Sequence, residues 1–164
     1  MSAAVRDARP ECQRIVGVFL DERMSIRRSP AVEHERKVAI YDLLEANEFA
    51  PTDGLEGPFN LHLRVEDNRL VFDLHDEDDV FLSSLTLPQS VMKKVVRDYF
   101  MVCDSYFKAI KTQPPSRIEA IDMGRRGLHN EGAEILSEHL AEKVRMDTDT
   151  ARRLFTLVCV LHIR

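Results

Sequence analysis

Residues that could bind an anion are concentrated in one segment, 123–132, which reads MGRRGLHNEG. Guanidinium groups bind phosphates and carboxylates through paired hydrogen bonds, and free backbone N–H groups at a helix start attract the same anions. The segment therefore predicts a binding site for a small phosphorylated or carboxylated ligand. Its side chains would come from Arg125, Arg126, His129, Asn130 and Glu131.

The same segment has a purely structural interpretation as the corner between two helices. Gly127 can end the first helix in the left-handed conformation, and Asn130 can cap the second. Arg125 and Arg126 would then stabilise a helix C-terminus by about 0.3–1 kcal/mol without any ligand. The segment also lacks the Lys-Ser/Thr ending of a P-loop and does not match a dinucleotide fingerprint following a strand. The sequence favours the helix corner, and the anion site is the alternative.

Catalytic residues cannot be assembled into a complete set from this sequence. Cys103 and Cys159 fall within apolar stretches of predicted helices, as buried and unreactive thiols do, and Cys12 precedes every predicted element. No Gly-x-Ser-x-Gly turn is present. His129 and Glu131 could supply general acid–base chemistry, but two neighbouring residues do not define a site. The catalytic residues are therefore unknown, and the sequence leaves open whether the protein is an enzyme.

The strongest metal-ligand pattern is formed by His62, Asp73 and His75, which share one face of a predicted hairpin. His62 and Asp73 also suit a plain cross-strand polar pair on a solvated face. No pair of Cys or His residues has the spacing of a zinc finger. We therefore expect no metal ion and no other cofactor.

Two helices joined by a short turn could bind DNA, but the charge of the second helix argues against this function. Residues 131–143 contain four glutamates and a single lysine, and so acidic a helix is repelled by the phosphates that line a groove. The whole chain is mildly acidic as well, with 23 Lys plus Arg against 28 Asp plus Glu. We expect no DNA partner.

The composition is that of an ordinary globular domain. At 164 residues with 44% hydrophobic side chains, the chain can bury about 70% of the surface that its unfolded form would expose. Charges occupy the N-terminal region where a signal peptide needs an apolar run, and the longest apolar stretch, 154–163, is roughly half a membrane helix. Three cysteines, an odd number, suit reduced thiols. These features predict a cytoplasmic protein with no membrane partner.

Hydrophobic periodicity predicts the elements of one domain, residues 13–164, after a mobile lead-in of residues 1–12. Apolar residues on both parities predict a central strand at 14–21, and further strands are predicted within 59–75 and 80–87. Ser29-Pro30 predicts a helix start. The helices are predicted from Pro30 to about Asn47, from the residue after Pro88 to before Pro114, from the capping box Ser116–Glu119 to about Arg126, from Asn130 to about Lys143, and from Asp147 or Asp149 onward.

The hairpin within 59–75 has a predictable register. A two-residue turn at Asp67-Asn68 suits residues that tolerate positive φ. It would pair Val65 with Leu70, Leu63 with Phe72, Leu61 with Leu74, His62 with Asp73 and Asn60 with His75. A slip by one residue would place the apolar side chains on the wrong face. Together the elements predict an α+β fold: a four-stranded, largely antiparallel sheet, an early helix, and three to four C-terminal helices packed on one face.

Four segments carry a resemblance to a known family: 33–43, 98–106, 120–132 and 149–162. They resemble a family of uncharacterised alphaproteobacterial proteins of about this length, and the likeness covers most of residues 14–164. The resemblance implies kinship and brings no activity with it.

Two functions are compatible with these features. Because no catalytic set can be assembled, the sequence favours a small non-enzymatic cytoplasmic module that binds a protein partner or regulates one. The alternative is a small enzyme or sensor that binds a phosphorylated or carboxylated metabolite within 123–132.

Overall fold

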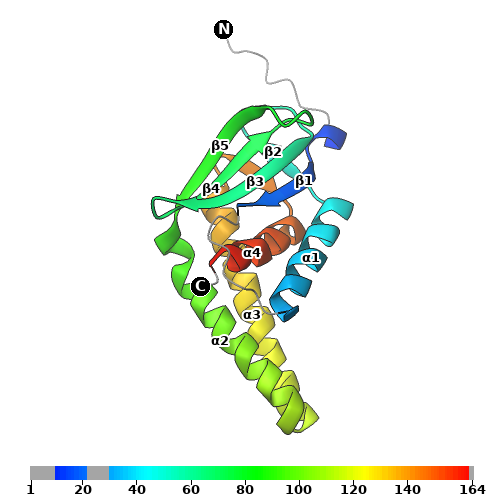
Figure 1. The fold of residues 1–164 in the computed structure, drawn as a ribbon, viewed down its shortest axis with the longest axis vertical. Coiled ribbons are helices and arrows are strands. Elements are labelled where there is room, and N and C mark those ends of the chain that lie inside the picture. The colour runs from blue at the N-terminus through cyan, green and yellow to red at the C-terminus, as the bar shows by residue number, and fades with distance from the viewer. Residues whose placement is uncertain (1–9, 22–29, 163–164) are drawn as a thin grey trace.

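The structure is a computed structural model that describes residues 10–21 and 30–162. It has a sheet on one side and helices on the other (Figure 1). The helices are η1 (Pro10–Cys12, a 3-10 helix), α1 (Pro30–Glu45), α2 (Gln89–Thr112), α3 (Pro115–Leu140) and α4 (Thr148–His162). The strands are β1 (Ile15–Leu20), β2 (Phe49–Pro51), β3 (Phe59–Glu66), β4 (Arg69–His75), β5 (Phe81–Pro88) and β6 (Val144–Met146). This is the α+β fold that the sequence predicts.

The main sheet has four strands in the order β1-β3-β4-β5. β1 and β3 are parallel and the other two pairs are antiparallel, so the sheet is mixed but largely antiparallel, as predicted. The prediction of a central strand at 14–21 is wrong, because β1 lies at the edge. Not all of its apolar residues are in the core. Phe19 is half-exposed on the other face of the sheet, where it stacks on the ring of His62.

The β3–β4 hairpin has the predicted register. Asp67 and Asn68 form the turn with φ angles of 51° and 61°, and every predicted pair from Asn60–His75 to Val65–Leu70 is present. The alternation buries Leu61 in the core, whereas His62 points to the opposite face and keeps 30% of its side-chain surface exposed. A separate two-stranded ribbon of β2 and β6 was not predicted, because strands of three residues are too short to show an alternation of apolar and polar side chains.

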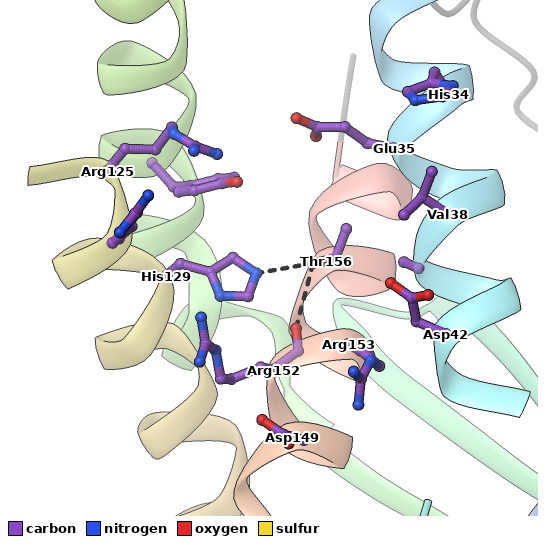
Figure 2. Close-up of a pocket in the computed structure, with 13 residues that line it drawn as sticks. His34, Glu35, Val38, Asp42, Arg125, His129, Asp149, Arg152, Arg153 and Thr156 are labelled. Atoms are coloured by element: carbon purple, nitrogen blue, oxygen red, sulfur yellow. Dashed lines mark hydrogen bonds between the residues drawn. The ribbon is translucent and has the colours of Figure 1, made fainter. Parts of the chain in front are cut away.

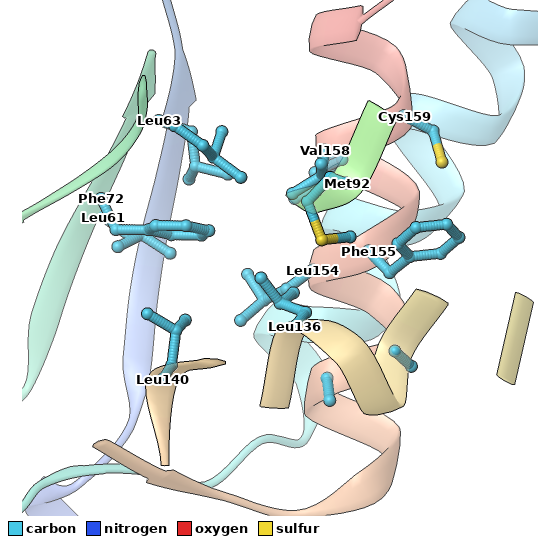
Figure 3. Close-up of a cluster of buried hydrophobic side chains, with 14 of the residues drawn as sticks. Leu61, Leu63, Phe72, Met92, Leu136, Leu140, Leu154, Phe155, Val158 and Cys159 are labelled. Atoms are coloured by element: carbon cyan, nitrogen blue, oxygen red, sulfur yellow. The ribbon is translucent and has the colours of Figure 1, made fainter. Parts of the chain in front are cut away.

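The hydrophobic core lies between the sheet and α4. Figure 3 shows Leu61 and Phe72 of the sheet on one side, and Leu154 and Val158 of α4 on the other. All four side chains are fully buried. Met92, Leu136 and Leu140 close the cluster from α2 and α3. The apolar run near the C-terminus therefore forms a helix buried around much of its circumference.

The predicted corner at 123–132 does not exist, because α3 is one continuous helix from Pro115 to Leu140. Gly127 does not end a helix and Asn130 does not begin one. Glycine inside a helix costs about 1 kcal/mol, which packing of α3 against α2 and α4 outweighs. The predicted capping box is not formed either. Helix α3 begins at Pro115, directly after Pro114, and no side chain caps its N-terminus.

The other helix predictions agree with the structure within a few residues, and Ser29, the expected cap of α1, lies outside the described residues. Residues 1–9 of the predicted lead-in also lie outside them, whereas the last three form η1. In the part of the chain that the structure describes, none of the helices combines the length and apolar character needed to span a bilayer.

Candidate functional site

A cleft of about 550 Å³ lies between α1, α3 and α4, with one residue contributed by α2 (Figure 2). Its lining carries four guanidinium groups, three carboxylates and two imidazoles. The lining residues are His34, Glu35, Val38, Ala39, Asp42, Tyr99, Arg125, Arg126, His129, Asp149, Arg152, Arg153 and Thr156.

Helix α3 contributes three of the five residues of the predicted anion site: Arg125, Arg126 and His129. Arg126 follows Arg125 by one position and His129 follows it by four, so the three side chains lie along one side of the helix. Arg125 donates hydrogen bonds of 3.0 and 2.7 Å to Oδ1 of Asp122, and Arg126 pairs with Oδ2 at 3.0 Å. The hydrogen bonds from Arg125 lower the pKa of Asp122. One carboxylate therefore orients two arginines and neutralises only one of their charges.

Helix α4 adds Arg152 and Arg153 to the same cleft. Figure 2 shows Arg152 on the side toward α3 and Arg153 on the side toward α1. Within the described residues, neither guanidinium forms an ion pair with a carboxylate. These two positive charges are therefore available to an anion in the cleft.

His129 lies where α3 and α4 meet. Its Nε2 is 2.8 Å from the hydroxyl of Thr156, which is also 3.3 Å from the carbonyl oxygen of Arg152 (Figure 2). Burial, with the charges of Arg152 and Arg125, lowers the pKa of His129 to about 4. The imidazole is therefore neutral at pH 7. If the hydroxyl donates to the carbonyl, Nε2 donates to the hydroxyl and Nδ1 is left as an acceptor.

Helix α1 forms an acidic wall opposite the arginines. Glu35 and Asp42 project from it toward the cleft (Figure 2). Burial raises the pKa of Glu35, although the charges of Arg125 and His34 act in the opposite direction. Burial also raises the pKa of Tyr99, so its hydroxyl stays protonated. The cleft thus has a basic side, an acidic side and one further protonated group, the Tyr99 hydroxyl.

The remaining residues of the predicted site lie elsewhere. Asn130 lines a smaller neighbouring cavity of about 350 Å³, and Glu131 is exposed and lines neither cavity. Residues two apart on a helix point to different sides, so the predicted acid–base pair of His129 and Glu131 is not assembled. The backbone around 123–132 is helical, and its N–H groups are not arranged as the anion-binding turn that the sequence suggested.

The sequence of the chain matches the model of an uncharacterised protein family, UPF0262, over residues 12–164. The chain belongs to this family. A UPF0262 protein of Paramagnetospirillum magneticum is 56% identical over 155 residues, which are 94% of this chain and 99% of the relative. One of Sphingopyxis alaskensis is 52% identical over 162 residues, 96% and 98% of the two chains. The resemblance recognised in the four segments is confirmed. No solved structure matches the protein at a significant level.

Membership of UPF0262 does not indicate an activity, so the function must be inferred from the residues of the cleft. Sequence reasoning missed Glu35, Arg152 and Arg153, which other helices bring to the cleft. One signal was readable: the Arg152-Arg153 doublet repeats the Arg125-Arg126 doublet and stands at the start of an apolar helix. Nothing in the sequence indicated that the two doublets meet.

Two thiols are buried, as the sequence predicts. Cys103 and Cys159 are almost fully covered, and burial raises the pKa of both, that of Cys103 to about 11. Thiols that remain protonated at pH 7 are poor nucleophiles. Cys12 is partly exposed in η1.

The predicted histidine cluster is only partly assembled as expected. His62 and Asp73 are opposite each other in the sheet, but the Asp73 carboxylate binds Arg64 and Ser84 instead. Burial alone would raise the pKa of Asp73, and these hydrogen bonds outweigh it and lower the pKa. His62 instead contacts Asp79 at 2.8 Å, and Asp79 is not among the predicted metal ligands.

Proposed function

We propose that the protein binds a small phosphorylated or carboxylated metabolite in the cleft between α1, α3 and α4. The observation that carries this proposal is the position of Arg152 and Arg153, which line the cleft without a carboxylate partner among the described residues. Guanidinium groups form charge-assisted, often bidentate hydrogen bonds with phosphate and carboxylate oxygens. Arg126, whose side chain is 68% exposed, can turn toward the same ligand.

The opposite wall of the cleft restricts the ligand further. Glu35 and Asp42 offer acceptors on α1, so a ligand whose far end carries an amine or hydroxyl groups would satisfy both walls. Neutral His129 and protonated Tyr99 can bind uncharged polar groups between the two ends. These features support a polar metabolite with one anionic end, and a cleft of about 550 Å³ is within the size range of small-molecule sites.

Thermal unfolding in the presence of a panel of phosphate- and carboxylate-bearing metabolites, with inorganic phosphate as the simplest probe, tests this function. A ligand that binds only the folded state raises the melting temperature. We expect at least one compound to stabilise the protein, and calorimetry to show affinity at least about tenfold weaker in an Arg126→Gln, Arg153→Gln double variant. Arg117→Gln is the matched control, because Arg117 is exposed on the same α3 helix outside the cleft.

Two outcomes would contradict the proposal: no stabilisation across the panel, or equal affinity of the double variant and the wild type. The double variant should itself fold normally. Exposed ion pairs such as that of Arg126 contribute little to stability, and Arg153 has no ion pair with a described residue.

The α2–α3 hairpin supports a second candidate function, the binding of a protein partner that the sequence favours. The hairpin extends away from the sheet (Figure 1). Four of its large apolar side chains, Met101, Phe107, Ile110 and Met123, are between 45% and 66% exposed. Exposed apolar surface of this kind marks interaction sites when it is contiguous. Recovery of a stoichiometric partner from native lysate, together with a metabolite panel without effect, would favour this function over the cleft.

A further inference from the structure

A second group of ligand-type side chains lies on the open face of the sheet. His62 of β3, His75 of β4 and Asp79 of the β4–β5 loop each offer one ligand atom, and these three atoms lie within 4.8 Å of one another. His62 Nε2 is 2.8 Å and His75 Nδ1 is 3.4 Å from the same carboxylate oxygen of Asp79. His75 Nδ1 also lies 3.0 Å from the backbone carbonyl oxygen of Asp79, so both imidazoles are held by the same residue.

The two rings are held in place by their neighbours. The centroids of His62 and His75 are 4.1 Å apart, and the ring of Phe19 stacks on the other side of His62 at 4.8 Å. Phe81 contacts His75 edge-on at 5.8 Å. Both histidines are partly covered, with 30% and 19% of their side-chain surfaces exposed. The imidazoles are thus oriented before any ligand arrives, which reduces the entropy lost on binding.

The loop that carries Asp79 is also fixed. The Asp76 carboxylate accepts hydrogen bonds from the backbone N–H groups of Asp78 and Val80, each 2.9 Å long. Asp79 adopts a left-handed backbone conformation with φ of 62°. A register irregularity at the end of the β4–β5 pairing precedes this turn. Such irregularities redirect side chains, and here the Asp79 carboxylate lies over the histidine pair.

We propose that His62, His75 and Asp79 bind one divalent transition-metal ion of the Zn²⁺ class. Two nitrogens and one carboxylate oxygen suit borderline ions such as Zn²⁺, Ni²⁺ and Co²⁺ better than Mg²⁺ or Ca²⁺, which prefer oxygen ligands. Ligand bonds of about 2.1 Å in tetrahedral geometry put ligand atoms about 3.4 Å apart, so small side-chain rotations close the site. Asp79 is 55% exposed, so the remaining coordination positions face water and stay open to an exogenous ligand.

Hydrogen bonding without a metal is the competing explanation of this cluster. His62 Nε2 lies 2.8 Å from the Asp79 carboxylate and His75 Nδ1 lies 3.0 Å from the Asp79 backbone carbonyl oxygen, so each ring has an acceptor. In the metal-bound form His75 Nδ1 exchanges that hydrogen bond for the cation, because neutral imidazole nitrogens and a carboxylate can all donate to it.

The test is titration of the full chain, stripped of metals with a chelator, with ZnCl₂ in a calorimeter. CoCl₂ is the spectroscopic probe, since nitrogen and oxygen ligation of Co²⁺ changes its visible absorption. We expect one equivalent to bind saturably, and His62→Ala and Asp79→Asn each to weaken binding at least about tenfold. Asparagine tolerates the left-handed conformation at position 79, so Asp79→Asn removes the charge and keeps the turn.

Three matched variants complete the experiment. Asp78→Asn removes a neighbouring loop carboxylate, His139→Ala removes an exposed histidine on α3, and Cys12→Ser removes the partly exposed thiol that could bind Zn²⁺ instead. All three should bind like the wild type. Unchanged binding in His62→Ala and Asp79→Asn, loss of binding in Cys12→Ser, or the absence of saturable binding in the wild type would each overturn the proposal. Circular dichroism of the metal-free variants checks that each is folded.

Discussion

His129 shows how a single side chain takes its chemistry from its position. A free histidine titrates near pH 6.5, whereas burial and the charges of Arg152 and Arg125 lower the pKa of His129 to about 4. Both arginines line the same cleft, so the groups that attract an anion also keep the imidazole neutral. An anion bound between them would weaken that effect and raise the pKa of His129.

Stability should depend on the protonation of His129 in a defined pH window. The folded-state pKa is below the unfolded value, so the contribution is complete above pH 6.5 and is lost progressively as the pH falls toward about 4. The full loss is about 3 kcal/mol. Urea unfolding at several pH values should show this decline in the wild type and a flatter profile in His129→Gln. Comparison with that variant separates His129 from Glu35, whose raised pKa has the opposite effect on stability. Parallel profiles would contradict this prediction.

Only those cleft residues that are neighbours in the sequence could be predicted. Arg125, Arg126 and His129 are neighbours in sequence, so their chemistry was visible without a fold. Glu35 and Arg152 reach the cleft because α1 and α3 both pack against α4, across more than 100 residues in the case of α1. That packing depends on the shape of the assembled core, and no local pattern contains it.

Helix α3 shows tertiary packing overriding local helix-breaking signals. Three glycines within nine residues suggested a corner, but they have different surroundings in the continuous helix. A Cβ added at Gly124 or Gly127 would meet nothing within 4 Å. A Cβ added at Gly132 would collide with the ring of Phe155, which is fully buried in α4. Only Gly132 is therefore required for the close approach of the two helices.

This difference predicts opposite effects of the same substitution at two positions of one helix. Gly127→Ala should stabilise the protein by about 0.5–1 kcal/mol, because alanine is the better helix former and has open space there. Gly132→Ala should destabilise it by about 1–3 kcal/mol, because the added methyl group displaces Phe155. Chemical denaturation of both variants measures the two values, and Gly132→Ala in combination with Phe155→Leu should recover part of the loss. A stable Gly132→Ala variant would contradict the packing argument.

The molecule as a whole places its two candidate sites on different sides of one core. The cleft lies among the helices, and the histidine cluster lies on the sheet face that these helices leave open. The hairpin that carries His62 and His75 was predictable in register because its turn and alternation are local. The edge position of β1 was not predictable from the sequence, because the neighbours of a strand depend on the topology of the whole sheet. In the structure, the side chain of Asn47 binds the backbone of this edge strand.

Asn47 joins the two layers of the fold, and its loss should weaken the entire molecule. Its Oδ1 accepts a 2.7 Å hydrogen bond from the N–H of Ile15, and its Nδ2 donates to the carbonyl oxygens of Ile15 and Leu43 at 2.9 and 2.7 Å. Ile15 is fully buried, so Asn47→Ala leaves backbone groups of β1 unsatisfied and should cost about 2–3 kcal/mol. Urea unfolding should show a lower midpoint with an unchanged slope. Asn47→Asp keeps the acceptor for Ile15 but turns a carboxylate oxygen toward the carbonyl oxygens of Ile15 and Leu43, which repel it, so this variant should be no more stable than Asn47→Ala. An Asn47→Ala variant as stable as the wild type would show that β1 is held by its pairing with β3 alone.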